Sequence, residues 1–432
     1  MGVHRPMTTA EKYYTFLDHQ WPSNVMISAD LARCFEPETV AAVWDEFRAR
    51  RILGRAVATE DLTLADPGVE PGHFLSRDLP VDAWDAVFDE ESTVRHELGL
   101  APRLHYLRDP AAGRSRLILL GHHALLDGRI GLSEVQWLVR LLDGQDIPEQ
   151  QELSSPPPAE KVHPWQQSRA AMLDLLRTIR ARNLEVGTPG PTWWPDASVP
   201  SRPRLQQLVL EPERAAAFLA VGREHRSSAF STVAAAWLGI VAREFCDADA
   251  PGGDGRATVQ LAVPADLSTP SPTPDAPTAM AVAVLARPFR VDPDDPWTLS
   301  GEIVATIREA LARGEGDLFF QLTRTEKVED LETGSNLVAT TLSAGPPCVV
   351  VSNMGVIDPG TDPDWLTFVQ GQLAPAPNQA VFVATLSYRG RLVHTIATDD
   401  NRIDERRSAD LIASYRAFLD DVAAGRGAGG DG

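Results

Sequence analysis

The feature that most limits the fold of this chain is one proline-rich segment that separates two stretches of alternating strands and helices. The segment 143–164, DGQDIPEQQELSSPPPAEKVHP, carries five prolines and few residues that could be buried, which is typical of a linker. A chain of 432 residues is also too long for one hydrophobic core of ordinary size. We therefore predict two subdomains, 7–145 and 205–424, with a linker and crossover over 146–204 and a disordered tail over 425–432.

Hydrophobic periodicity predicts a mixed α/β or α+β fold. Alternation over 25–31 predicts a half-buried strand, and Glu36-Pro37 opens a helix with an apolar face. The segments 103–107 and 116–121 flank a turn-rich stretch and predict a hairpin. In the second half, helices are expected near 165–183, 212–225, 227–245, 299–311 and 411–422, and strands near 204–210, 257–264, 279–289, 346–355, 379–388 and 391–398.

Composition excludes several classes of protein. The formal net charge of −20 would repel phosphate backbones, so we do not expect a nucleic-acid partner. The sequence has no run of 18 apolar residues and no apolar signal segment at its start, so we expect no membrane span and no secretion. Three widely separated cysteines (Cys34, Cys246 and Cys348) fit neither a disulfide framework nor a metal site. We expect a cytoplasmic protein.

An acidic protein needs a local basic patch to bind an anionic substrate or an acidic partner. The densest basic stretch is RARRILGR, which contains Arg48, Arg50, Arg51 and Arg55. A solvated helix end explains this stretch equally well.

The segment LILLGHHALLDGRIG, residues 117–131, places two adjacent histidines after a buried strand. In the helix that follows, Ser133 and Gln136 fit a capping box, and Gly144 is typical of the residue at which a helix ends. The histidines therefore belong to a loop between a strand and a helix.

Three interpretations of His122 and His123 compete. They could be hydrogen-bonded structural residues, with Asp127 capping the loop and Gly128 supplying an unusual backbone angle. They could bind a metal, but adjacent residues at a strand end point in opposite directions and no other ligand cluster is present, so we expect none. Finally, a neutral imidazole can act as a general base at neutral pH.

His122-His123-Ala-Leu-Leu-Asp127-Gly128 matches the HHxxxDG signature, and by it the chain resembles the superfamily of condensation domains and CoA-dependent acyltransferases. The segments MTTAEKYY and PETVAAVWDEFRARRILGRA resemble the opening of that family. VVVSNMG, residues 349–355, is similar to the SNxG strand of stand-alone acyltransferases associated with polyketide synthases, and GRLVHTIATDD resembles their late strand. The resemblance covers roughly residues 7–424.

The resemblance implies two chloramphenicol acetyltransferase-like subdomains in a V-shaped pseudo-dimer, with a tunnel between them. It implies an acyltransferase in which His123 is the general base, His122, Asp127 and Gly128 shape its loop, and Ser352 and Asn353 contact substrate. A structural role of Ser352 and Asn353, at the turn where the strand ends in Asn-Met-Gly, explains them equally well. The donor would be acyl-CoA or an acyl group on a carrier protein's phosphopantetheine arm, and the acceptor a hydroxyl or amine of a secondary metabolite or lipid. No permanently bound cofactor and no metal are implied, and a monomer is expected.

The sequence also departs from the family pattern. Relatives often carry Asp-Leu-Arg where this chain has Asp266-Leu267-Ser268, and serine is frequent at the position of Ile130. Asp127 would then pair with another cation, for which Arg287 and Arg256 are candidates, or stay unpaired. We expect a substitute, because an unpaired buried carboxylate is costly. Two alternatives stay open: a free-standing condensation enzyme that joins carrier-bound substrates, and a non-catalytic scaffold with the same fold.

Overall fold

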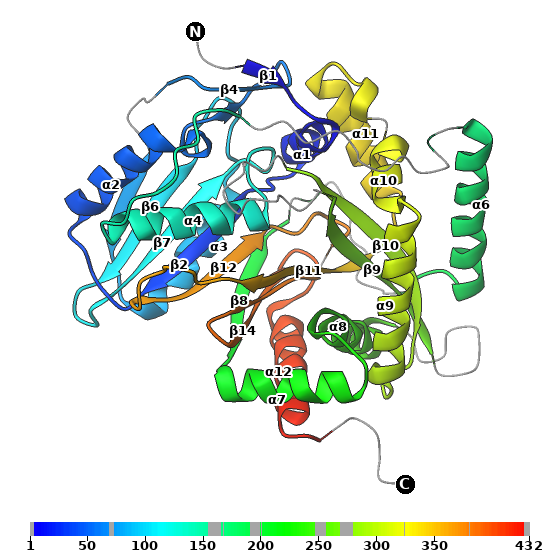
Figure 1. The fold of residues 1–432 in the computed structure, drawn as a ribbon. Coiled ribbons are helices and arrows are strands. Elements are labelled where there is room, and N and C mark those ends of the chain that lie inside the picture. Colours follow the sequence, from blue (N-terminus) through cyan, green and yellow to red (C-terminus); the bar gives the residue numbers. More distant parts are fainter. Residues whose placement is uncertain are drawn as a thin grey trace.

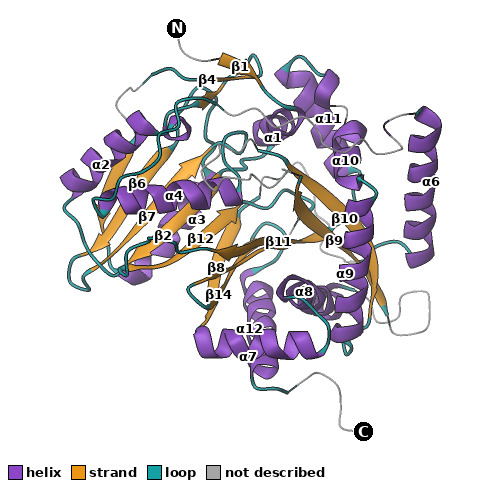
Figure 2. Ribbon diagram, in the orientation of Figure 1, coloured by secondary structure: helices purple, strands orange, loops and turns teal. Residues whose placement is uncertain are grey.

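Two β-sheets, one built mainly from each half of the chain, face each other at the centre of the molecule (Figure 1). The computed structural model describes residues 4–68, 73–153, 166, 168–190, 199, 201–246, 256–267, 280–323, 325–379 and 381–426. Much of the predicted linker and nearly all of the predicted tail lie outside these residues, as does Ser268. The mixed architecture of helices and sheets expected from the sequence is confirmed (Figure 2).

The N-terminal sheet has five strands in the order β12-β2-β7-β6-β5. Their bounds are β2 (Val25–Leu31), β5 (Phe74–Asp78), β6 (Arg103–Asp109), β7 (Arg114–Gly121) and β12 (Leu366–Leu373). The antiparallel pair β6–β7 confirms the predicted hairpin. Helices α2 (Pro37–Arg50) and α4 (Gly128–Leu142) cover one face, and α3 (Trp84–Thr93) packs on the other.

The prediction of a half-buried strand over 25–31 is wrong, because all seven residues of β2 are buried. β2 lies in the interior of the sheet, with α4 packed against one face and the second sheet against the other. Small polar residues such as Ser28 produced the apparent alternation, although they too are buried.

The C-terminal sheet has six strands in the order β10-β9-β11-β13-β14-β8. Their bounds are β8 (Pro203–Leu210), β9 (Ala257–Asp266), β10 (Val282–Val291), β11 (Cys348–Ile357), β13 (Val381–Tyr388) and β14 (Arg391–Asp399). One face is covered by α7 (Pro212–Glu224), α8 (Ala229–Phe245), α9 (Pro296–Ala312) and α12 (Glu405–Ala423). The opposite face packs on the N-terminal sheet, where Val350 and Ala384 join the same cluster as Met26 and Trp84.

Segments from the second half of the chain complete the first. β12 pairs with β2 in the N-terminal sheet, although sequence placed residues 366–373 in the C-terminal subdomain and predicted no strand there. The sequence did not predict this strand because it contains Gln370, Gly371 and Gln372. Polar residues of this kind do not indicate a buried strand, although Gln370 and Gln372 are in fact buried. Helix α11 (Leu331–Ser343) packs on α1 (Thr9–Gln20), where Gly334 leaves room for the ring of Phe16.

The remaining elements lie at the periphery. A small sheet contains β1 (His4–Pro6), β3 (Val57–Ala58) and β4 (Thr63–Ala65) in the order β1-β4-β3. Helix α10 (Glu315–Thr323) contacts α9 and α1, whereas α6 (Arg169–Val186) has no buried residue and stands at the edge of the molecule (Figure 1). Among the described helices, none has the length and hydropathy needed to cross a bilayer.

The predicted basic patch is largely interior. Arg48, Arg51 and Arg55 are each at most 5% exposed, and Arg50 pairs with carboxylates beside it. Arg51 forms a buried ion pair with Glu134 of α4, and Arg55 binds Asp66. These guanidinium groups join α2 to α4 and the small sheet, so the stretch offers little free positive charge to a ligand.

Candidate active site

The histidine loop spans residues 122–127, between the end of β7 and the start of α4. The N–H groups of Leu125 and Leu126 both donate to the carbonyl of His122, which closes the loop into a tight turn. The side chains of His122 and His123 face different surroundings, as expected for neighbours that follow a strand.

His123 presents an unprotonated ring nitrogen to a pocket. Its Nδ1 lies 3.0 Å from the carbonyl oxygen of Leu126, which can only accept, so Nδ1 carries the proton and Nε2 keeps its lone pair. The ring of Tyr14 stacks on the imidazole, with centroids 3.9 Å apart. Burial lowers the pKa of His123 to about 4, so the ring is neutral at neutral pH.

His122 points away from the pocket into the protein. Its Nδ1 accepts the N–H of Ala124, so its proton resides on Nε2, which lies 3.6 Å from Oδ2 of Asp18. The other oxygen of Asp18 accepts the N–H of Ser23 at 2.8 Å and its hydroxyl at 3.2 Å. His122 is therefore a structural neighbour of the pocket rather than part of its wall.

Asp127 caps helix α4. Its Oδ1 accepts the N–H of Ile130 at 2.8 Å, so the helix begins at Gly128 and the predicted capping box at Ser133 is wrong. Burial raises the pKa of Asp127 to about 6, and the hydrogen bond from Ile130 opposes that shift.

Neither arginine proposed as the partner of Asp127 fills that role. Arg287 binds Glu315, and Arg256 binds Asp292. A different ion pair connects the two halves at this place, between Arg129 and Asp266. Arg129, which follows the motif glycine, thus binds Asp266 and not the carboxylate of Asp127.

Gly128 adopts no left-handed angle, so the expectation of an unusual backbone conformation is wrong. A close approach explains the glycine instead. A β-carbon at Gly128 would lie 3.0 Å from Cε of Met354, and one at Gly371 would lie 2.8 Å from the same atom. Gly128 and Gly371 thereby leave room for the side chain of Met354, which extends from β11 between α4 and β12.

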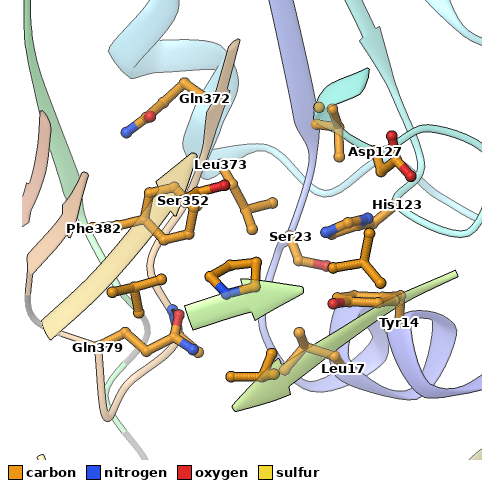
Figure 3. A pocket seen from close by; sticks show the side chains of 18 of the residues that line it. Tyr14, Leu17, Ser23, His123, Asp127, Ser352, Gln372, Leu373, Gln379 and Phe382 are labelled. Atoms are coloured by element: carbon orange, nitrogen blue, oxygen red, sulfur yellow. Dashed lines mark hydrogen bonds between the residues drawn. The ribbon is translucent and has the colours of Figure 1, made fainter. Parts of the chain in front are cut away.

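The pocket lies between the two halves and contains about 1100 Å³ of empty space, part of it open to solvent. Its wall is mostly apolar and is contributed by α1, β2, the histidine loop, β9–β13 and the segment after β12. His123 and Asp127 line one region, and Ser352, Gln372 and Gln379 lie on the other side (Figure 3). Gly128 and Asn353 also line the pocket.

Ser352 and Asn353 line the pocket from β11, and their contact with substrate stays a prediction. Asn353 is exposed, and its Oδ1 accepts the N–H of Gly355 at a bulge where φ of Gly355 is +80°. Its amide NH₂ and the hydroxyl of Ser352 remain available to a ligand.

Sequence reasoning missed Tyr14, Asp18 and Ser23. Tyr14 belongs to the opening segment that carried the resemblance, but an aromatic residue in an amphipathic helix has no signature that distinguishes it from a core residue. Within the described ranges, no three His, Cys, Asp or Glu side chains are grouped as metal ligands.

Comparison with known proteins agrees with this geometry. Residues 199–392 match the family described as phthiocerol/phthiodiolone dimycocerosyl transferase C-terminus. Polyketide synthase associated protein 5 from Mycobacterium tuberculosis superposes with a TM-score of 0.63 over 97% of both chains, at 18% identity. The chain has the fold of condensation domains and CoA-dependent acyltransferases.

Other solved structures share this condensation-domain fold. Trichothecene 15-O-acetyltransferase from Fusarium sporotrichioides gives a TM-score of 0.72 at 12% identity, over 98% of this chain and 96% of the other. The condensation domain of the monacolin K polyketide synthase gives 0.63 at 11% identity, over 98% of both chains. No curated protein sequence matches the chain significantly.

Proposed function

We propose that the protein is an acyltransferase that moves an acyl group from a phosphopantetheine thioester to a hydroxyl or amine. The observation that carries the proposal is the state of His123, a neutral imidazole whose bare Nε2 belongs to the wall of the pocket between the halves. The fold, which is shared with a known acetyltransferase, supports the same conclusion.

In the proposed reaction, Nε2 of His123 removes the proton of the acceptor as its oxygen or nitrogen attacks the thioester carbonyl. The tetrahedral oxyanion then collapses, the C–S bond breaks, and the thiolate takes the proton from His123. The hydrogen bond from Nδ1 to Leu126 fixes the tautomer and the ring orientation throughout. A positioned base supplies roughly 10²- to 10⁴-fold, and alignment of the two substrates in the pocket supplies further acceleration.

The apolar wall suits a hydrophobic acyl group or acceptor. Either acyl-CoA or an acyl carrier protein can deliver the thioester, because both present the same arm. Arg51 and Arg55 are engaged in ion pairs and offer no free patch for an acidic carrier or for the phosphates of CoA, so they do not distinguish the two donors.

The test measures release of free thiol from a panel of acyl-CoAs, with mixed alcohols and amines as acceptors. We expect His123→Ala to lower the rate at least about a hundredfold. His225→Ala is the matched control, because His225 stacks on Trp297 away from the pocket. Equal rates for His123→Ala and wild type would refute the base assignment. If no CoA ester reacts, acyl-loaded carrier protein becomes the donor to test, and failure there too would favour a scaffold.

A further inference from the structure

Tyr14 is placed against the proposed base by the N-terminal helix. A capping box between Thr8 and Glu11 starts α1, and the helix directs Tyr14 and Leu17 to the pocket. The phenol and imidazole rings stack at 3.9 Å with an angle of 26° between their planes. Figure 3 shows the two rings one above the other, with the phenol oxygen at the side of the pocket.

The hydroxyl proton of Tyr14 is available. No described residue accepts a hydrogen bond from it, although the residue is only 4% exposed and lines the pocket. Burial, with contributions from Tyr13 and Asp127, raises the pKa of the phenol well above its usual value of 10. The group is therefore a permanent hydrogen-bond donor and not a base.

The hydroxyl of Ser23, which also lines the pocket, is differently engaged. Ser23 lines the same region of the pocket, but its Oγ lies 3.2 Å from Oδ1 of Asp18, which accepts its proton. Ser23 can thus offer lone pairs to a ligand, whereas Tyr14 offers a proton. Of these two hydroxyls beside the base, Tyr14 is the one able to stabilise negative charge.

We propose that Tyr14 is a catalytic residue that donates a hydrogen bond to the oxyanion formed when the acceptor attacks the thioester. This inference rests on the proposed acyl transfer. The nucleophile's proton moves to Nε2 of His123, the carbonyl π pair moves onto oxygen, and the O–H of Tyr14 binds that oxygen without transferring its proton. When the C–S bond breaks, the carbonyl reforms and the hydrogen bond weakens.

The stacking of Tyr14 on His123 suits the proposed roles, in which His123 accepts the proton and Tyr14 donates to the oxyanion. The attacking atom and the oxyanion are bonded to the same tetrahedral carbon. The base and the donor to the oxyanion must therefore lie close together in one site. The stacked rings of His123 and Tyr14, which are in van der Waals contact, hold the two groups close together in this way. The stack also limits rotation of the imidazole, which complements the hydrogen bond between Nδ1 and Leu126.

The test compares Tyr14→Phe, which keeps the ring and removes only the hydroxyl, with wild type in steady-state thiol release. We expect kcat to fall by about 100-fold, KM to stay nearly constant, and the acidic limb of the pH profile to stay in place. Tyr106→Phe is the matched control. It removes a buried hydroxyl that binds the backbone of Phe35 outside the pocket, so kcat should not change.

Each outcome has a defined meaning. An unchanged kcat in Tyr14→Phe, alongside an inactive His123→Ala, would overturn the inference and leave the proposed function standing. A raised KM at constant kcat would also overturn it, since the hydroxyl would then bind the ground state. A wild-type protein that turns over neither acyl-CoA nor acyl carrier protein would refute the proposed function, and the inference with it. Melting temperatures of the variants show whether each one is folded.

Discussion

The Nε2 atom of His122 lies 3.6 Å from Oδ2 of Asp18, and both side chains are almost completely buried. Since the N–H of Ala124 occupies Nδ1 of this histidine, its ring proton faces the carboxyl group. Asp18 is in turn held by Ser23, which lines the pocket. The contact between the first histidine of the motif and Asp18 thereby places the histidine loop against helix α1.

Replacing Asp18 with asparagine should impair catalysis through this connection. If the amide oxygen keeps the hydrogen bonds from Ser23, the amide NH₂ faces the Nε2–H of His122, and two donors then repel each other. We expect the loop to shift and kcat to fall on the order of tenfold to a hundredfold. The measurement is steady-state thiol release, with Asp420→Asn on the surface of α12 as the control. Full activity in Asp18→Asn would show that the contact does not position the loop.

The pH dependence of the reaction should reflect the buried state of His123. A protonated imidazole cannot accept a proton, and burial lowers its pKa to about 4. Activity should therefore persist as the pH falls below the usual histidine value of about 6.5 and disappear only as it passes through about 4. The profile of kcat/KM, recorded with circular dichroism to verify folding, tests this. A limb near 6.5 that persists in Asp127→Asn would indicate a solvated imidazole.

Substitutions of Asp127 test whether titration of its carboxyl group affects the rate. Asparagine caps helices about as well as aspartate, so Asp127→Asn should retain stability, whereas Asp127→Ala should lose roughly 0.5–2 kcal/mol. Urea unfolding measures both variants. If Asp127, whose pKa is raised to about 6, contributes a limb to the pH profile, that limb will vanish in Asp127→Asn.

Gly131 lies against β2, an interior strand of the N-terminal sheet. A β-carbon there would come 2.5 Å from Cγ1 of Ile27, which a packed β-branched side chain cannot easily avoid. We expect Gly131→Ala to destabilise the protein by roughly 1–3 kcal/mol. Gly301→Ala is the control: that glycine is also helical but nothing lies within 4 Å of its β-position, so stability should rise slightly. Equal effects in the two variants would contradict the packing argument.

The sequence alone determined the local elements around the site. The apolar run of β7, the histidine loop and the amphipathic helix that follows were all predicted, as was the hairpin of β6 and β7. The six strands of the C-terminal sheet were predicted as well. These features depend on periodicity and turn residues within a few positions of one another, and a single chain segment carries that information.

Only the tertiary structure decided what depends on distant contacts. It placed β12 beside β2, buried Arg48, Arg51 and Arg55, and paired Arg129 with Asp266. It also separated the two histidines, so that His122 contacts Asp18 and His123 stacks on Tyr14. Burial, ion pairing and the availability of a proton depend on which groups meet in the folded chain. The strand pairing, the Arg129–Asp266 ion pair and both histidine contacts join residues more than a hundred positions apart.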